Sequence, residues 1–483
     1  MDKPSVREEA PRLGAKVRAL RRRENLTQTQ FAEKLGVSAS YVNLIENNRR
    51  PLPSAMLIKM AQLFAIDLAT FGDEQDTRTV ADLLEVFSDS LFESHDMTSV
   101  DVRELATNAP ATARAVLHLY GAYKEARESL DNLATKVRDG EGSSVSVDRT
   151  SVPSEEVSDL LQHHGNYFPE LERIAQRLWK DGKLAHEELH QGLVRWLERT
   201  HGVEVRVDRW SQDRNVLRRF EPKTKILHLS EILPTRSRRF QIAHQVGLLL
   251  ASDAMDAIVA ESHQLTTDES RALARVALAN YFAGAVLMPY DSFLRSAKEE
   301  RYDLDVLGRR FRVGFEQVCH RLTSLRKPGA EGVPFHMVRV DVAGNISKRF
   351  SGSGLRIARF SGVCPRWNVF AAFQTPGMIR IQHSKMPDGS EFFCLARTVA
   401  KDAIGYQPQQ TLQAIGLGCK LEFARELVYS DGYDLGNVEG TIPVGVTCRT
   451  CERQDCEERA VPSLRQPLRI DENVRGISIY SKA

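Results

Sequence analysis

Three of the seven cysteines in this chain crowd into nine residues near its end, at Cys448, Cys451 and Cys456. Thiolates at this spacing can converge on one metal centre only from an irregular loop. Pro443 and Gly445, just before them, favour such a loop. The run therefore predicts a metal site, and the alternative interpretation is three cysteines that bind nothing.

A metal held by these cysteines needs a fourth ligand from elsewhere in the chain. Our first choice is Cys419, which flanking glycine in Gly-Leu-Gly-Cys leaves accessible, and the alternative is Cys364 in Gly-Val-Cys-Pro. Three cysteines from one loop with a remote fourth are typical of a [4Fe–4S] cluster and also of a structural zinc site. The spacing leaves both cofactors open.

A second pattern, from Arg239 to Leu250, lies where a zinc metallopeptidase would carry its H-E-x-x-H helix. The first histidine is present as His244, but the glutamate position holds Gln245 and the second ligand position holds Leu248. One neutral imidazole cannot hold a catalytic zinc ion, and an amide cannot act as the general base. We therefore predict that the chain is not an enzyme and that His244 is a core or pocket residue.

In a zinc metallopeptidase of this kind, a carboxylate ligand would precede the downstream stretch of residues 279–289. Here Ala277 and Leu278 stand in that place, so this ligand is missing too. A fold that keeps its cavity and loses its catalyst is a candidate ligand-sensing domain. Its ligand-binding residues are unknown from the sequence, although six basic residues here could meet phosphates: Lys180, Lys223, Lys225, Arg236, Arg238 and Arg239.

Near the N-terminus, the sequence predicts two short helices around a tight turn. Thr27 and Gln30 form a capping box for the first helix, and Gly36 suits the turn because glycine tolerates a positive φ. Ser38 caps the second helix, whose Val42 and Ile45 face inward. This is a helix-turn-helix, in which the outer face of the second helix enters the major groove of DNA.

The candidate DNA-binding residues lie on or beside these helices. They are Arg18, Arg22, Gln28, Ser38, Ser40, Tyr41, Asn43, Asn47 and Arg49. From Pro11 to Gly72 there are ten Lys and Arg against four Asp and Glu, so this region carries 10 − 4 = +6, although the whole chain carries only +2. A local basic excess is expected where phosphates are met. The alternative is a helical protein-interaction module with a solvated basic face.

At 483 residues the chain is long enough for several domains. We predict a multidomain, mainly α-helical protein with an α+β C-terminal part. The expected parts are a helix-turn-helix domain (1–75), a helical connector (76–138), a flexible Gly/Ser-rich linker (139–157), a degenerate zincin-like sensing domain (158–327) and a C-terminal domain with the cysteine site (328–483). Strands are expected at residues 203–207, 225–229, 335–342, 377–383 and 391–397, with a hairpin turn at 386–389.

The connector carries an apolar repeat with spacings of 3, 4, 3, 4 and 3 residues: Val116, Leu119, Tyr123, Ala126, Leu130 and Leu133. This is the seam of a two-stranded coiled coil and predicts a homodimer. A helix packed on its own chain is the alternative. Dimers suit a helix-turn-helix because DNA with paired half-sites gives useful affinity.

Three resemblances follow from these segments. Leu13 to Phe71 resembles the phage-repressor-like helix-turn-helix family, with Gln28, Gly36 and Glu46 at matching positions. Residues 187–289 resemble ImmA/IrrE-type peptidase domains and depart from them at the catalytic positions. The order of all parts, with Cys364-Pro-Arg-Trp-Asn368 and the cysteine run, resembles the short-chain fatty acyl-CoA-responsive transcriptional regulators.

The last resemblance implies a regulator of propionate and acetate metabolism genes whose DNA affinity is set by a bound short-chain acyl-CoA. It also implies an iron–sulfur cluster in the C-terminal domain. Two alternatives stay open: a redox-sensing iron–sulfur regulator, and a metallopeptidase that cleaves a partner repressor. No stretch approaches eighteen consecutive apolar residues and the start lacks a signal-peptide core, so we expect a cytoplasmic protein without membrane contact.

Overall fold

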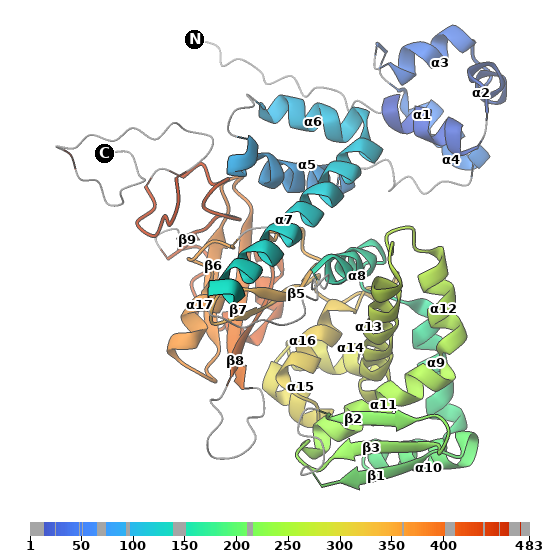
Figure 1. Cartoon of the computed structure of the whole chain (residues 1–483), viewed down its shortest axis with the longest axis vertical. Coiled ribbons are helices and arrows are strands. Elements are labelled where there is room, and N and C mark those ends of the chain that lie inside the picture. The colour runs from blue at the N-terminus through green and yellow to red at the C-terminus, as the bar shows by residue number, and fades with distance from the viewer. Residues whose placement is uncertain are drawn as a thin grey trace. The chain divides into compact units, whose positions relative to one another are not determined.

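The computed structural model describes residues 14–24, 26–47, 49–50, 52–64, 74–92, 97–138, 151–209, 216–359, 362–400, 411–437, 440–453, 455–462 and 474. The chain divides into two compact units, one of residues 1–142 with 358–361 and one of residues 143–357 with 362–483 (Figure 1). No single helix among the described residues has the length and apolar composition of a membrane span. Two bent helix pairs, at residues 235–261 and 268–299, meet that test only when each pair is taken together.

The first unit begins with the predicted helix-turn-helix. Its helices are α1 (Gly14–Arg23), α2 (Gln28–Leu35), α3 (Ala39–Glu46) and α4 (Ser54–Phe64). They enclose a small core of eight buried apolar residues: Val17, Leu20, Phe31, Ala32, Leu35, Val42, Ile45 and Met60. Val42 and Ile45, predicted to face inward, are both in this core, so the apolar periodicity was sufficient to orient α3.

The connector is helical, as predicted, and has a core of its own. Its elements are α5 (Glu74–Phe87), the short η2 (Ser90–Phe92), α6 (Ser99–Asn108) and the long α7 (Pro110–Arg138). The core contains Leu83, Val86, Val102, Ala106, Ala113, Leu117 and Tyr120. The predicted coiled-coil seam lies beside this buried stripe of α7: Leu119 is 71% exposed, and Val116 and Tyr123 are partly buried against the core. The side chains of Leu130 and Leu133 lie outside the described residues.

The linker prediction was wrong at its C-terminal end. Residues 139–150 lie outside the described residues, but α8 (Ser151–His163) includes residues 151–157. Proline is compatible with the first turn of a helix, where its missing N–H leaves no bond unmade. Pro153 therefore does not end the helix, and Val157 and Leu160 bury the apolar face that follows it.

The second unit continues with helices around a three-stranded sheet. The helices are α9 (Pro169–Asp181), α10 (Leu189–His201), α11 (Thr235–Leu250), α12 (Ser252–Glu261), α13 (Asp268–Leu287), α14 (Tyr290–Glu299), α15 (Leu304–Arg310) and α16 (Phe315–Thr323). The strands are β1 (Glu204–Asp208), β2 (Arg218–Glu221) and β3 (Ile226–Ser230) in the order β1-β3-β2. β1 and β3 were predicted, whereas the four-residue β2 was not.

The C-terminal part of this unit is a six-stranded sheet in the order β5-β4-β8-β7-β6-β9. Its elements are β4 (His336–Asp341), β5 (Ile346–Ser351), α17 (Asn368–Ala371), η3 (Ala372–Gln374), β6 (Arg380–Lys385), β7 (Glu391–Ala400), β8 (Leu412–Lys420), η4 (Leu421–Glu426), η5 (Val428–Ser430) and β9 (Ile442–Pro443). β4, β6, β7 and the turn before β7 confirm the predictions, and the mainly helical fold with a C-terminal sheet is as expected.

The predicted boundary near residue 327 does not separate two cores. One apolar cluster includes helical residues such as Phe282 and Phe293 together with sheet residues Phe393, Ile415 and Leu417. Helix α16 contacts β4, and α8 contacts β5. The sheet therefore buries one face against the helices between residues 151 and 323, and both regions belong to one unit.

Candidate functional site

The turn between α2 and α3 is built by local hydrogen bonds. The Gln30 amide N–H donates to Thr27 Oγ1 (3.3 Å) and the Thr27 N–H donates to Gln30 Oε1 (2.9 Å), which confirms the capping box. Gly36 adopts φ = +69° at the end of α2. Ser38 then caps α3, because its Oγ accepts from the Tyr41 N–H at 3.2 Å. These caps fix the direction of α3 relative to α2.

The outer face of α3 carries short polar side chains, as predicted. Ser40 and Asn43 are exposed, and so are Ser38 at its start and Asn47 and Arg49 beyond its end. Tyr41 is only half-exposed, because the Arg50 guanidinium lies 4.8 Å from the centre of its ring. The contact of these residues with DNA stays a prediction. The Arg22 side chain lies outside the described residues.

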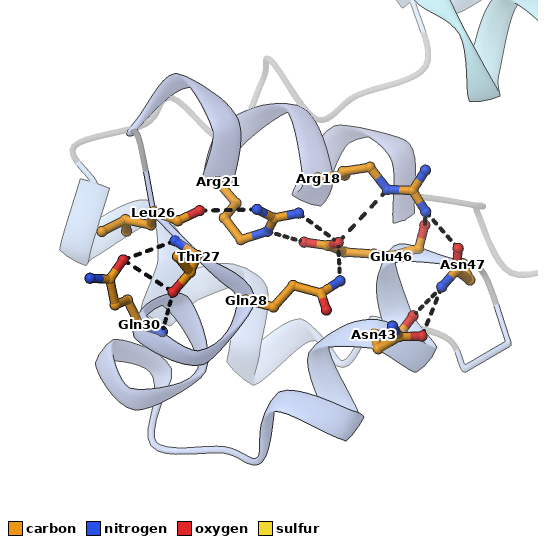
Figure 2. Close-up of polar contacts among 9 residues, drawn as sticks. All are labelled: Arg18, Arg21, Leu26, Thr27, Gln28, Gln30, Asn43, Glu46 and Asn47. Atoms are coloured by element: carbon orange, nitrogen blue, oxygen red, sulfur yellow. Dashed lines mark hydrogen bonds and ion pairs between the residues drawn. The ribbon is translucent and has the colours of Figure 1, made fainter.

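Glu46 joins three helices, a role that was not predicted (Figure 2). Its carboxylate, 2% exposed, accepts from Arg21 Nε at 2.6 Å and Nη2 at 3.1 Å, and from Gln28 Nε2 at 2.8 Å. Burial raises the pKa of Glu46, but hydrogen bonds from Arg21 and Gln28 and the charges of Arg21 and Arg18 outweigh it and lower the pKa overall. Glu46 is thus a charged anchor between α1, α2 and α3.

Two predicted DNA contacts belong to this anchor. The Gln28 side-chain amide donates to the Glu46 carboxylate. Arg18 Nη2 donates to the Glu46 carbonyl at 3.0 Å and to Asn47 Oδ1 at 2.6 Å. Asn47 Nδ2 in turn donates to Asn43 Oδ1 at 2.8 Å. Arg18 and Gln28 therefore position α3 in this structure. The acidic residue at the end of an otherwise basic segment was the signal that could have indicated it.

In the second unit, α11 carries the degenerate H-E-x-x-H pattern and packs on α13. His244 is 3% exposed, and the Arg218 guanidinium from β2 contacts its Nδ1. The carbon of a side chain added at Gly247 would lie 2.8 Å from the Phe282 ring, so α11 and α13 are in close contact. A guanidinium cation against this ring nitrogen disfavours a zinc ion at the same nitrogen. Nothing in the sequence of β2 indicated this contact.

We expect His244 to remain neutral well below neutral pH. Burial, and then the charge of Arg218, lower its pKa to about 4, whereas a free histidine titrates near about 6.5. The unfolded chain therefore takes up this proton first, and His244 contributes stability that is lost as the pH falls from about 6.5 toward 4. Titration of ¹³C-labelled imidazoles by NMR measures this pKa.

The variant Arg218→Ala should raise the pKa of His244, because it removes the neighbouring charge. Arg219→Ala changes the next residue of β2, whose exposed side chain points to the opposite face of the strand, and is the matched control. A His244 that titrates near 6.5 in the wild-type chain would contradict this arrangement.

A cluster of cationic side chains lies between the start of α10 and helix α11. Arg239 is 6% exposed, its Nε has no partner, and its Nη1 reaches only the Arg312 carbonyl at 3.4 Å. Arg312 donates to the Glu187 carbonyl, and Arg238 to the Leu233 carbonyl. Burial, and then Arg238 and Arg239, lower the pKa of His190, whose Nδ1 is buried without a partner. None of these three arginines has a carboxylate partner among the described residues.

The cysteine run lies around a small pocket of the C-terminal region. The residues that line it include four cysteines, Cys364, Cys448, Cys451 and Cys456, together with Gly445 and Arg459. The Cys364 N–H donates to the Val446 carbonyl at 2.9 Å, which holds the two segments together. Arg459 donates to the Cys448 carbonyl at 2.9 Å and to the Cys451 carbonyl at 3.1 Å. A guanidinium therefore lies beside the thiols.

The structure corrects our choice of the fourth cysteine. Cys419 is fully buried on β8, opposite Phe393 of β7, and belongs to the shared apolar core. Flanking glycines do not expose it, because Gly418 is packed against His336 of β4, which lies 2.5 Å from where its side chain would begin. Cys364, the alternative, is the one beside the run.

The donor set fits a metal centre of thiolates. Four thiols line one pocket, and a neighbouring cation stabilises negatively charged sulfur. Among the described residues, no group of three or more His, Cys, Asp or Glu side chains has the geometry to hold a metal ion. The described residues between Cys448 and Cys456 form a turn and irregular backbone, with no helix or strand.

The capped helices, the charged anchor and the exposed face of α3 define the first unit as a helix-turn-helix of the DNA-binding type. Family comparison agrees. Residues 17–71 match the Helix-turn-helix family, residues 198–323 the IrrE N-terminal-like domain, and residues 324–480 the family described as Short-chain fatty acyl coenzyme A regulator, C-terminal.

Curated relatives extend over nearly the whole chain. The Propionyl-CoA carboxylase regulator of Cereibacter sphaeroides is 40% identical over 97% of this chain and 98% of its own length. The HTH-type transcriptional regulators PrpR and RamB of Mycobacterium tuberculosis are each 38% identical over 97% of this chain, and over 95% and 98% of their own lengths. A solved Mycobacterium tuberculosis transcriptional regulator is 42% identical over 68% of this chain and 99% of its own, with a TM-score of 0.66.

This chain therefore belongs to the family of short-chain fatty acyl coenzyme A regulators, and it is a helix-turn-helix transcriptional regulator.

Proposed function

We propose that this protein regulates genes of short-chain fatty acid metabolism, such as propionate and acetate use, and that a short-chain acyl-CoA bound in the second unit sets its affinity for DNA. The observation that carries the proposal is the cation cluster of Arg238, Arg239, Arg312 and His190 inside a peptidase-like fold, for which the described residues offer no acidic partner. Guanidinium groups without carboxylate partners suit phosphate oxygens, which coenzyme A supplies. Of these arginines, Arg239 is buried, Arg238 is partly buried and Arg312 is exposed.

The regulator acts as a homodimer on DNA with paired half-sites. The exposed Leu119 of α7, beside partly buried Val116 and Tyr123, supports a seam between two copies. A single α3 with short side chains would bind one half-site weakly. In a dimer, two recognition helices bind two half-sites together. An acyl-CoA can shift DNA binding only through a difference in its affinity for two arrangements of the dimer.

The middle region of the protein catalyses no reaction. Arg218 contacts the one histidine of the peptidase pattern, and Gln245, 3% exposed, cannot serve as a base. This part of the proposal fails if the full chain contains stoichiometric zinc that His244→Ala removes.

The test of acyl-CoA sensing is thermal unfolding of the full chain with acetyl-, propionyl- and longer acyl-CoAs. A ligand at 100 times its Kd adds about 2.7 kcal/mol to the stability of the folded state and raises the Tm. Free coenzyme A separates recognition of the acyl group from recognition of phosphate. Arg239→Gln should weaken the shift for every CoA species, while the exposed Arg199→Gln should not. No shift with any CoA species would contradict the proposal.

A second candidate function, redox sensing, is favoured by the four-cysteine pocket. We propose that Cys364, Cys448, Cys451 and Cys456 hold a [4Fe–4S] cluster, with structural zinc as the alternative. A cluster supplies one-electron redox chemistry, and the thiolates and Arg459 set its electrostatic surroundings. DNA binding measured anaerobically with the cluster intact and after its destruction tests this function. Unchanged binding would exclude redox sensing.

A further inference from the structure

A short segment of the C-terminal region belongs to the first compact unit. Residues 358–361 are part of that unit, although the chain on both sides of them is part of the second. Before the segment, Ser351 of β5 is held by Gln162 of α8 through bonds of 2.8 and 3.0 Å. After it, Cys364 is bonded to Val446. The segment is therefore anchored at both ends.

The segment meets the acidic side of α5. The Arg359 N–H donates to Glu85 Oε2 at 2.9 Å, and Arg359 Nη1 lies 3.6 Å from Asp82 Oδ2. The Arg359 side chain is only 16% exposed and that of Asp82 12%, while Ala358 is 2% exposed. Ion pairs at this depth are costly to break, because the remaining charge stays buried without its partner.

Helix α5 is central to the connector. Leu83 and Val86, beside the two acids, have no exposed surface and belong to the connector core. The Tyr120 hydroxyl of α7 donates to Asp89 Oδ2, two residues after the end of α5, at 2.7 Å. Helix α6, which packs on α5, also contacts α1 of the helix-turn-helix. A displacement of α5 therefore bears on the helices that support DNA binding.

We propose that Ala358 and Arg359 form a strap that transmits changes at the cysteine pocket to α5 and the DNA-binding unit. Arg359 and Cys364 are five residues apart, so at most about 18 Å of extended chain separates them. This limits how far Cys364 can move before it displaces Arg359 from Asp82 and Glu85. The strap rests on the proposed regulatory function, but its test needs neither DNA nor acyl-CoA.

Hydrogen exchange of the full chain tests the docking. Arg359→Ala should speed exchange of the α5 amides by about tenfold, because one charge-assisted contact stabilises the helix locally. Arg356→Ala, three residues earlier and exposed, is the matched control and should leave α5 unchanged. Asp82→Asn keeps the shape of the acid that pairs with the Arg359 guanidinium and should reproduce the effect in part. Unchanged α5 exchange in Arg359→Ala would overturn the strap.

A second comparison tests transmission. Cys364→Ser should speed exchange of α5 in the chain that has Arg359, and should speed it less in the Arg359→Ala chain, which keeps only the backbone bond to Glu85. Exchange of α13, deep in the second unit, reports whether each variant is folded. If Cys364→Ser leaves α5 unchanged in the first background, or changes it equally in both, the coupling does not run through Arg359 and the proposal is overturned. Failure of acyl-CoA binding would affect neither result.

Discussion

Replacing Glu46 with alanine should abolish DNA binding, although Glu46 lies on the inner side of α3. The change leaves the Arg21 guanidinium and the Gln28 amide without their shared acceptor in a part-buried position. Removing one partner of a buried ion pair costs about 3–5 kcal/mol, which approaches the whole stability of a small domain. The helix-turn-helix should therefore unfold locally while the second unit stays folded.

Fluorescence anisotropy with DNA and far-ultraviolet circular dichroism on the full chain measure this result. Glu33→Ala is the matched control, since Glu33 is exposed on α2. Glu46→Gln keeps an acceptor oxygen and loses the charge, so it should bind DNA more weakly than the wild type and more tightly than the alanine variant. DNA binding by Glu46→Ala at wild-type affinity would show that the anchor is dispensable.

The anchor also has a pH dependence. The folded pKa of Glu46 is lower than that of a free glutamate, because the bonds and charges of Arg21, Gln28 and Arg18 outweigh its burial. The unfolded chain therefore binds the proton first as the pH falls. The contribution of Glu46 to stability is complete above about pH 4.5 and is lost as the pH falls through the folded pKa. Glu46→Gln should flatten this part of the stability profile.

The second large effect concerns the metal. Cys364→Ser should lower the bound metal of the full chain to less than about a tenth of the wild-type content, because the site loses one of four thiolates. The same holds for Cys448→Ser, Cys451→Ser and Cys456→Ser. Elemental analysis for iron and zinc, with acid-labile sulfide, on anaerobically purified protein measures the content and separates the two cofactors.

Cys419→Ala is the control that separates the two candidates for the fourth ligand. Cys419 is fully buried. Its charged and thiol neighbours are Cys394 of β7 and Glu422 and Glu426 of η4, not Cys448. Its replacement should reduce stability by a small cavity cost and leave the metal content unchanged. Loss of metal from Cys419→Ala with retention in Cys364→Ser would reverse our assignment.

The sequence was sufficient for those parts of the protein whose signals are short in range. Thr27 and Gln30 are three residues apart, and Gly36 marks the end of α2 by its own backbone freedom, so the helix-turn-helix could be predicted from caps and periodicity. The cysteine run predicted a metal site for the same reason, and the departures at Gln245 and Leu248 were visible residue by residue.

Only the tertiary structure decided which distant side chains meet. Arg218 and His244 are 26 residues apart, and Arg359 and Glu85 are 274 residues apart. Such pairs depend on how strands and helices pack, which no local spacing encodes. Flanking glycines made Cys419 look exposed, yet they let β8 pack tightly and bury it, while Cys364 was brought beside the run by a bond to Val446. The three clustered thiols were thus determined by sequence alone, and the fourth thiol of their pocket by packing.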